Sequence, residues 1–148
     1  MGSYADDALF MSRNNIEYVE LISDDGKSKV MVIPAWQGRV MTTSAAGDEG
    51  DSYGWINYSF IKKRQIDLQF NPVGGEERFW LGPEGGVFSL YFRQGEKQIY
   101  KNWKVPPVLD IEAFKIQSQS KNCICLTKEG CLTNACGCLL YTSDAADD

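Results

Sequence analysis

The chain has 148 residues, 43% of them hydrophobic and 12% aromatic, and a formal net charge of −5 at pH 7. This length and composition predict one folded domain with a real core and exclude a largely disordered chain. The negative charge with scattered basic residues argues against a nucleic-acid partner, and the lack of about 18 consecutive apolar residues argues against a membrane partner.

The first 15 residues do not have the pattern of a secretory signal. They contain two aspartates where a signal peptide would have lysines, and they lack an apolar core segment. We therefore expect no signal peptide in this chain and leave the localisation of the whole protein open. The sequence also has no histidine, so it cannot complete an acid–base mechanism that depends on one.

Short strands separated by turn residues are predicted in the first half of the chain. Residues 16–23, 30–33 and 38–45 have strand patterns, and Asp25-Gly26 provides a hairpin turn between the first two. One short helix is predicted over residues 54–64, because Ile56 and Phe60 are one turn apart and cations occupy the last turn.

The second half is also predicted to be rich in strands. Residues 86–92 are apolar on both faces, which is typical of a central strand. The two prolines within residues 100–110 predict an extended loop, and residues 113–120 and 123–130 predict two further strands. The predicted fold class is therefore mainly β, an antiparallel β-sandwich with one short helix.

All five cysteines fall within residues 123–138. The first four, Cys123, Cys125, Cys131 and Cys136, are spaced C-x-C-x5-C-x4-C and lack the C-x2-C pairs typical of zinc sites. We therefore expect no metal site and no cofactor. A metal-binding or redox role for this cluster is retained as a less favoured alternative.

The segment GGEERFWLGPEGGVFSLYF, residues 74–92, combines glycine pairs with charged residues and a tryptophan. One interpretation is a tight β corner in which Arg78 pairs with a glutamate and Trp80 lies in the core. The other is a sugar site, since sugar rings stack on tryptophan and carboxylate or guanidinium groups bind their hydroxyls. Glu76 and Glu84 could also form an acid and base pair.

Several motifs resemble a family of uncharacterised bacterial proteins described as a domain of unknown function. They are VIPAWQGRVMTTSA, SYGWIN and NPVGGEERFWLGPEGGVFSLYF, residues 71–92, in which Glu77 and Val87 depart from the family's GGEDRFWLGPEGGQFS pattern. VLDIEAF and LTKEGCLTN resemble the family's following segments, so the resemblance extends from about Tyr4 to Gly137. Family members are substantially longer than this chain.

More distantly, these motifs are similar to galactose-mutarotase-like proteins, whose antiparallel β-supersandwich binds carbohydrate on its concave face. The resemblance implies that carbohydrate is the partner. The aldose epimerases of that group use a histidine and a glutamate from later parts of the chain, so no catalytic residue is assigned here. The resemblance implies six substrate-binding residues: Arg39, Asn71, Glu76, Arg78, Trp80 and Glu84.

The C-terminal residues 138–148, CLLYTSDAADD, resemble the translation of a transposon-end adapter used for sequencing libraries. We therefore expect residues 1–137 to be the incomplete N-terminal part of one supersandwich domain, and the tail not to be structural. The favoured function is carbohydrate binding or carbohydrate processing of the mutarotase or epimerase type. We expect this chain to be a truncated, inactive fragment of such a protein. The alternatives are a non-catalytic carbohydrate-binding module and a structural β-domain.

Overall fold

The computed structural model describes residues 2–140, which begin with helix α1, Tyr4–Arg13. The sequence analysis did not predict this helix. Ser3 caps it by accepting a hydrogen bond from the Asp6 amide at 3.2 Å, and the Asp6 carboxylate accepts one from the Ser3 amide at 3.0 Å. This reciprocal pair satisfies two backbone donors at the helix start.

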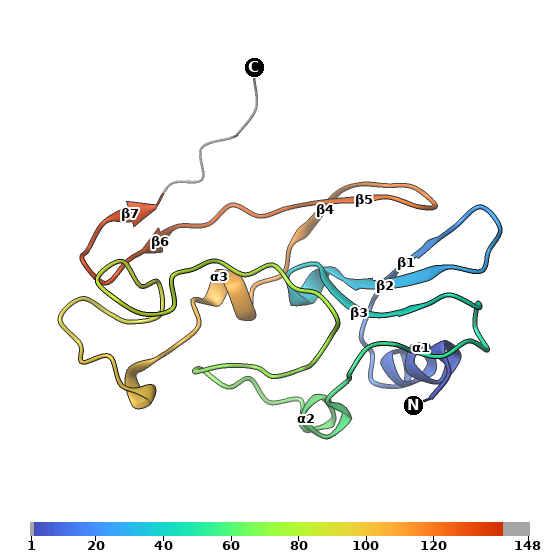
Figure 1. Cartoon of the computed structure of the whole chain (residues 1–148), viewed down its shortest axis with the longest axis horizontal. Helices are drawn as coiled ribbons and strands as arrows, with labels where there is room; N and C mark the ends of the chain where they lie inside the picture. Colours follow the sequence, from blue (N-terminus) through green and yellow to red (C-terminus); the bar gives the residue numbers. More distant parts are fainter. Residues whose placement is uncertain (1, 141–148) are drawn as a thin grey trace, which may run out of the picture.

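A three-stranded antiparallel sheet follows α1 and confirms the three strands predicted in this region. Its strands are β1 (Val19–Ile22), β2 (Lys29–Ile33) and β3 (Arg39–Ser44), in the order β1-β2-β3. A short 3-10 helix, Pro34–Trp36, connects β2 to β3, and the register shifts between Met31 and Val32. In Figure 1 α1 lies below this sheet.

The predicted helix is confirmed but is shorter than expected. Helix α2 covers Tyr58–Lys63, and the Asn57 side chain caps it by accepting a hydrogen bond from the Phe60 amide at 3.2 Å. Gly54 instead packs against β3, where a Cβ on it would come within 2.0 Å of the Met41 carbonyl oxygen, and the Asn57 amide donates a 3.0 Å hydrogen bond to the Val73 carbonyl. This close packing explains why the helix begins only after Asn57.

The first apolar core lies between α1, the sheet and α2. Its buried members come from each of these elements and from the segments on both sides of α2: Tyr4, Met11, Met31, Ile33, Met41, Ile56, Ile61 and Val73. Burial of this apolar surface is the main term that holds the N-terminal half together.

The prediction of a strand over residues 86–92 is wrong. The segment forms turns and bends, with Val87 and Phe88 67% and 61% exposed. Ser89 provides the alternative hydrogen bonds, since its amide donates to the Gly86 carbonyl and its hydroxyl to the Glu84 carbonyl. Such local side-chain bonds compete with a strand ladder.

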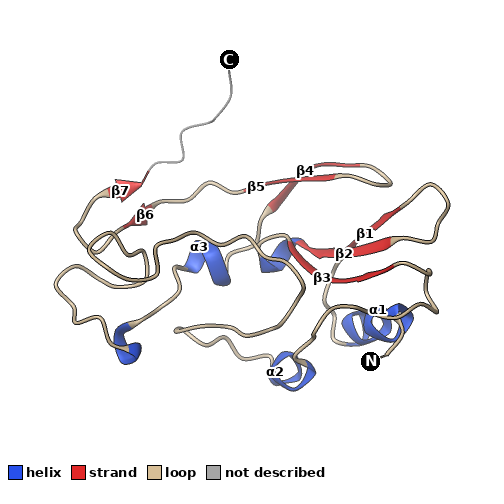
Figure 2. Cartoon of the chain, viewed as in Figure 1, coloured by secondary structure: helices blue, strands red, loops and turns tan. Residues whose placement is uncertain are grey.

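The predicted extended loop over residues 100–110 contains two short helices. These are a 3-10 helix, Tyr100–Asn102, and helix α3, Pro107–Asp110. Proline at the first helical position needs no amide donor, so Pro107 can begin α3. Figure 2 shows that long loops form most of the chain between α2 and β4.

The C-terminal part contains two small antiparallel sheets. The predicted strand pair is confirmed as β4 (Lys115–Gln119) and β5 (Ile124–Thr127). Strands β6 (Leu132–Thr133) and β7 (Leu139–Leu140) form the second pair. The adapter-like tail falls mainly on residues 141–148, which lie outside the described residues.

A second apolar core lies near α3. Its buried members are Leu90, Tyr91, Val105 and Leu109, and half-buried aromatic residues including Phe70, Trp80 and Trp103 pack around them. All strand pairs within residues 2–140 are antiparallel, so the fold is β-rich and antiparallel with few helices. Within the same residues, no helix has the length and apolar character needed to cross a bilayer.

Candidate functional site

The buried carboxylate of Asp110, at the end of α3, organises the most polar part of the interior. Its Oδ2 accepts hydrogen bonds from the Asn71 amide at 2.8 Å and from the Asn71 side chain at 2.7 Å. Its Oδ1 pairs with Arg78 Nη2 at 3.4 Å. The structure therefore brings two of the six residues implied by the resemblance together around a third residue that sequence reasoning missed.

Arg78 is held from two directions at the C-terminal end of α3. The same Nη2 donates a 2.6 Å hydrogen bond to the Leu109 carbonyl and pairs with Asp110. Burial lowers the pKa of Arg78, and the neighbouring Asp110 carboxylate acts in the opposite direction. The partner of Arg78 is thus an aspartate, whereas the β-corner interpretation expected a glutamate.

Arg39 lies at the start of β3 and is only 3% exposed. Its Nη1 donates a 2.7 Å hydrogen bond to the Gly74 carbonyl. Gly74 and Gly75 have φ values of 96° and 111°, and a Cβ on Gly75 would come within 2.9 Å of Arg39 Cδ, so both positions favour glycine. Burial, followed by the positive charge of Arg78, lowers the pKa of Arg39 to about 10, and Asp110 opposes this shift.

The two glutamates implied by the resemblance lie outside the Asp110 cluster. Glu76 is exposed and accepts hydrogen bonds from the Thr43 amide at 2.5 Å and the Thr43 hydroxyl at 3.0 Å. Glu84 is also exposed and accepts a 2.8 Å hydrogen bond from the Trp80 ring nitrogen. Both glutamates therefore act as local acceptors for nearby backbone or side-chain groups.

Trp80 connects the Asp110 cluster to the second core. The Arg78 guanidinium lies over its ring, 4.1 Å from the centroid, and the Tyr91 ring lies on it at 5.2 Å. Tyr91 in turn stacks on Trp103 at 5.6 Å and donates a 2.6 Å hydrogen bond to the Leu81 carbonyl. Burial raises the pKa of Tyr91 well above its ordinary value, so its hydroxyl stays protonated.

Three cavities stand out in the described part of the chain, with volumes of about 480, 270 and 150 Å³. Asp110 and Ile111 line both larger cavities, so the polar cluster lies where the two meet. The second cavity includes Trp36 and Asn71 in its wall, and the smallest has a mainly apolar wall. Only the largest falls in the range of about 300–1,000 Å³ typical of ligand sites.

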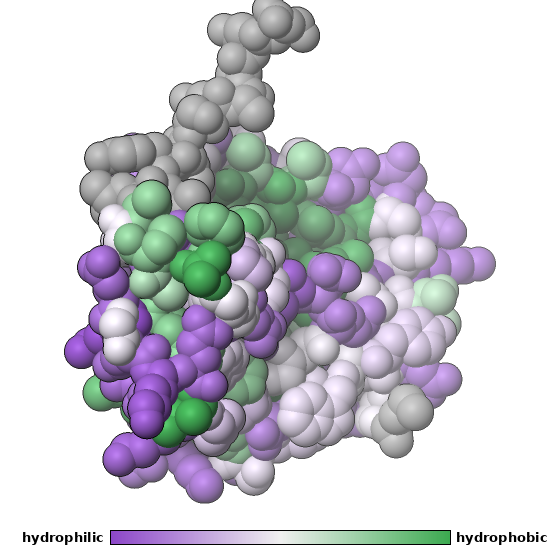
Figure 3. Space-filling view, turned by 60° about the vertical axis from the view of Figure 1, so that its left-hand side comes forward, coloured by the Kyte–Doolittle hydropathy of each residue, from purple (hydrophilic) through white to green (hydrophobic). Residues whose placement is uncertain are grey.

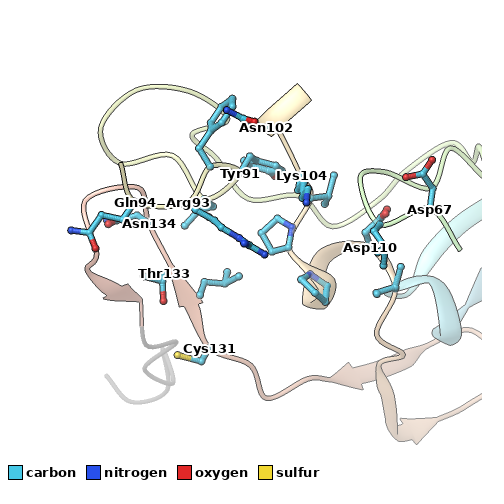
Figure 4. A pocket seen from close by; sticks show the side chains of 18 residues that line it. Asp67, Tyr91, Arg93, Gln94, Asn102, Lys104, Asp110, Cys131, Thr133 and Asn134 are labelled. Atoms are coloured by element: carbon cyan, nitrogen blue, oxygen red, sulfur yellow. The ribbon is translucent and has the colours of Figure 1, made fainter. Parts of the chain in front are cut away.

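The largest cavity is shown in Figure 4. Backbone hydrogen bonds hold its walls together, from the Lys104 amide to the Tyr91 carbonyl at 2.9 Å and from the Ala135 amide to the Ser89 carbonyl at 2.7 Å. Tyr91, Pro106, Pro107 and Leu132 contribute apolar surface. The polar side chains in its wall are Asp67, Arg93, Gln94, Asn102, Lys104, Asp110, Thr133 and Asn134.

Sequence reasoning identified none of these polar lining residues. They come from five separate segments between Asp67 and Asn134, and no short motif contains more than two of them. Of the six residues implied by the resemblance, only Asn71 lines one of the three cavities, the second. Two others lie behind the wall of the largest cavity. Arg78 pairs with Asp110, which lines the cavity, and Trp80 packs on Tyr91, which also lines it.

The cysteines are exposed and free within the described residues. Between residues 2 and 140, no three side chains of the histidine, cysteine, aspartate or glutamate types gather in a way that could hold a metal ion. Cys125 lies on the exposed side of β5 and Cys123 is exposed just before it, whereas Ile124 and Leu126 are half-buried.

Comparison with known proteins gave one family. Its sequence profile, described as a family of unknown function (DUF6786), matches residues 2–143. Searches of the curated proteins and of the solved structures found no significant match. The profile covers nearly the whole chain and confirms the resemblance to a domain family of unknown function. The chain therefore belongs to the DUF6786 family.

Proposed function

We propose that the protein binds carbohydrate in its largest cavity and is mutarotase- or epimerase-like in type. The observation that carries the proposal is a cavity of about 480 Å³ whose wall combines amide, guanidinium, carboxylate and apolar groups. Bound sugars require this combination, because their hydroxyls need hydrogen-bond partners while their C–H faces pack on apolar surface.

The polar groups are of the kinds that bind sugar hydroxyls. Gln94 provides an amide with both donor and acceptor atoms, and Asp67 provides acceptors. The Asn102 amide group donates to the Lys97 carbonyl and the Asn134 oxygen accepts from the Cys136 and Cys138 amides, so Asn102 contributes its oxygen and Asn134 its amide N–H groups. Pro106 and Leu132 offer apolar surface for the opposite face of a ring. In Figure 4 the labelled polar residues surround the cavity rather than lining one side.

We assign binding, rather than catalysis, to the residues of this chain. The sequence has no histidine, and both oxygens of Asp110 already accept hydrogen bonds from Asn71 or Arg78. A carboxylate held in this way is suited to positioning a ligand. Arg78 and Trp80 then have a supporting role, since they contact Asp110 and Tyr91 in the wall, while Arg39 holds the Gly74 backbone.

We also propose that the chain adopts part of a β-supersandwich. The antiparallel pairing of every sheet within residues 2–140 and the GGEERFWLGPEGG block support this assignment. A crystal structure of the protein would test it. Two large antiparallel sheets packed face to face are expected, and a helical or parallel architecture would contradict the proposal.

Calorimetric titration with a panel of neutral and acidic monosaccharides and disaccharides tests the proposed function. Thr133 is exposed on β6 and lines the cavity, so Thr133→Trp should fill the cavity and abolish binding. Ser118→Trp on exposed strand β4 is the matched control and should bind as the wild type does. NMR of the same samples should show that the bound sugar's anomers interconvert no faster than they do without the protein.

The outcomes separate the alternatives. Loss of binding in the Thr133 variant alone would support the cavity as the site. Unchanged binding in the Thr133 variant, with an unchanged melting temperature, would place the site elsewhere. The absence of binding to any member of the panel would overturn the proposed function and favour a structural β-domain.

A further inference from the structure

The charged side chains that line the largest cavity leave an excess of positive charge. Four charged side chains line it, Asp67, Arg93, Lys104 and Asp110. Asp110 already has Arg78 as its counter-ion at 3.4 Å, and the positive charge of Arg39 also acts on this cluster. Asp110 therefore leaves no net negative charge to balance the two cations in the wall.

Neither cation in the wall has a partner among the described residues. Arg93 and Lys104 take part in no ion pair within residues 2–140. Asp67 is the remaining carboxylate, and its Oδ1 accepts a 2.7 Å hydrogen bond from the Gln69 amide. Figure 4 shows the Arg93 side chain extending into the cavity, with Asp67 and Asp110 together at the other end.

We infer that the cavity binds an anionic carbohydrate, whose carboxylate pairs with Arg93 and Lys104. The inference rests on the proposed carbohydrate function and specifies its substrate class. A guanidinium can hold a carboxylate through two parallel hydrogen bonds, while a lysine adds a compact positive charge. Asp67 Oδ2, which accepts no hydrogen bond within residues 2–140, is available as an acceptor for a sugar hydroxyl.

The shape of the cavity favours a sugar acid over a simple inorganic anion. About 480 Å³ exceeds the space that one carboxylate or phosphate group would fill, and Gln94, Asn102 and Asn134 lie around the same space. The acceptor oxygens of Gln94 and Asn102 would have no role in binding an isolated anion, because an anion donates no hydrogen bond. They can pair with the ring hydroxyls of a uronic acid.

Titration with matched ligands tests the inference. The probes are methyl glucuronide and methyl glucoside of the same anomer, the corresponding galacto pair, and inorganic phosphate. We expect the uronides to bind about tenfold or more tightly than the neutral glycosides, as one charge-assisted interaction would give. Added sodium chloride should weaken uronide binding and leave neutral sugar binding unchanged, since both cations are exposed.

Charge-removing variants locate the carboxylate. Arg93→Gln and Lys104→Gln should each reduce uronide affinity about tenfold and remove the salt dependence in part, with little effect on the neutral glycosides. Lys63→Gln, at the end of α2 and outside the three cavities, is the control and should bind as the wild type does. Circular dichroism of each variant checks that it is folded.

Three results would overturn the inference, and they differ in what else they affect. Equal affinity for uronides and neutral glycosides would overturn the anionic class and leave the proposed function intact. A uronide preference unchanged by both Gln variants would overturn the assignment to Arg93 and Lys104. Binding of phosphate without binding of any sugar would overturn the proposed function as well.

Discussion

At the scale of single residues, Asp110 shows what the sequence could and could not reveal. Asn71 and Arg78 could be singled out because they lie in a segment that resembles a known family. Their common partner follows two prolines in a segment predicted to be an extended loop, so its burial was not predictable from local pattern. The polar residues of the largest cavity were missed for the same reason, since only the tertiary fold brings their segments together.

Removing the negative charge of Asp110 should destabilise the protein. Asp110→Asn leaves Arg78 half-buried without a counter-ion and weakens two hydrogen bonds from Asn71. We expect the free energy of unfolding to fall by about 2–3 kcal/mol. Urea denaturation followed by circular dichroism measures it. Asp24→Asn, which breaks an exposed 3.6 Å pair with Lys121, should cost less than about 1 kcal/mol, and equal losses would contradict the burial argument.

Tyr58 should make stability sensitive to alkaline pH. Burial and a hydrogen bond to the Asp7 carboxylate raise the pKa of Tyr58 from 10.0 to about 12. Because the folded state holds the phenolic proton more tightly, this stabilisation is complete below pH 10 and is lost as the pH rises toward 12.

A comparison with Tyr58→Phe measures this effect. The stability difference between wild type and variant should shrink between pH 10 and pH 12 in urea denaturation. Tyr53→Phe is the control, because Tyr53 is exposed and its hydroxyl makes no hydrogen bond within the described residues. A Tyr58→Phe difference that stays constant across this range would show that the Asp7 hydrogen bond does not favour the protonated phenol.

At the scale of elements, predictions succeeded where a segment's own pattern decided its structure. The strands of the N-terminal sheet and of the β4–β5 pair were confirmed because alternating residues and turn signals frame them. The strand over residues 86–92 was wrong, since Ser89 supplies hydrogen bonds that favour turns. Helix α1 was missed although Ser3 and Asp6 have the spacing of a capping box.

The capping box of α1 gives a prediction at this scale. Ser3→Ala removes the side-chain acceptor for the Asp6 amide and should lower the free energy of unfolding by about 1 kcal/mol. Ser12→Ala, in the last part of the same helix, should be neutral or slightly stabilising because alanine is the better helix former. Thermal denaturation compares the two, and equal effects would argue against a specific role of the cap.

At the scale of the whole molecule, two apolar cores coexist with much exposed apolar surface. Leu68 and Tyr100 are 78% and 77% exposed, in addition to Val87 and Phe88. In Figure 3 apolar residues extend across the upper part of the face shown. Extended apolar surface of this kind promotes association between protein molecules.

We therefore expect the chain to self-associate as its concentration rises. Sedimentation equilibrium should show masses above 16.6 kDa, and Val87→Ser with Phe88→Ser should reduce association without lowering the melting temperature. Gln119→Ser, an exposed change on β4, should leave association unchanged. A monomer at every concentration would show that this apolar surface does not promote association.

The stacked aromatic rings beside the largest cavity also make the intrinsic tryptophan fluorescence of the protein sensitive to ligand binding. Trp80 and Trp103 lie on either side of Tyr91, which lines the cavity, whereas Trp55 is 65% exposed on another part of the chain. Iodide should quench the emission of Trp55 selectively, leaving a signal dominated by the half-buried indoles. Ligand entry could then be followed in real time by intrinsic fluorescence, without any attached dye.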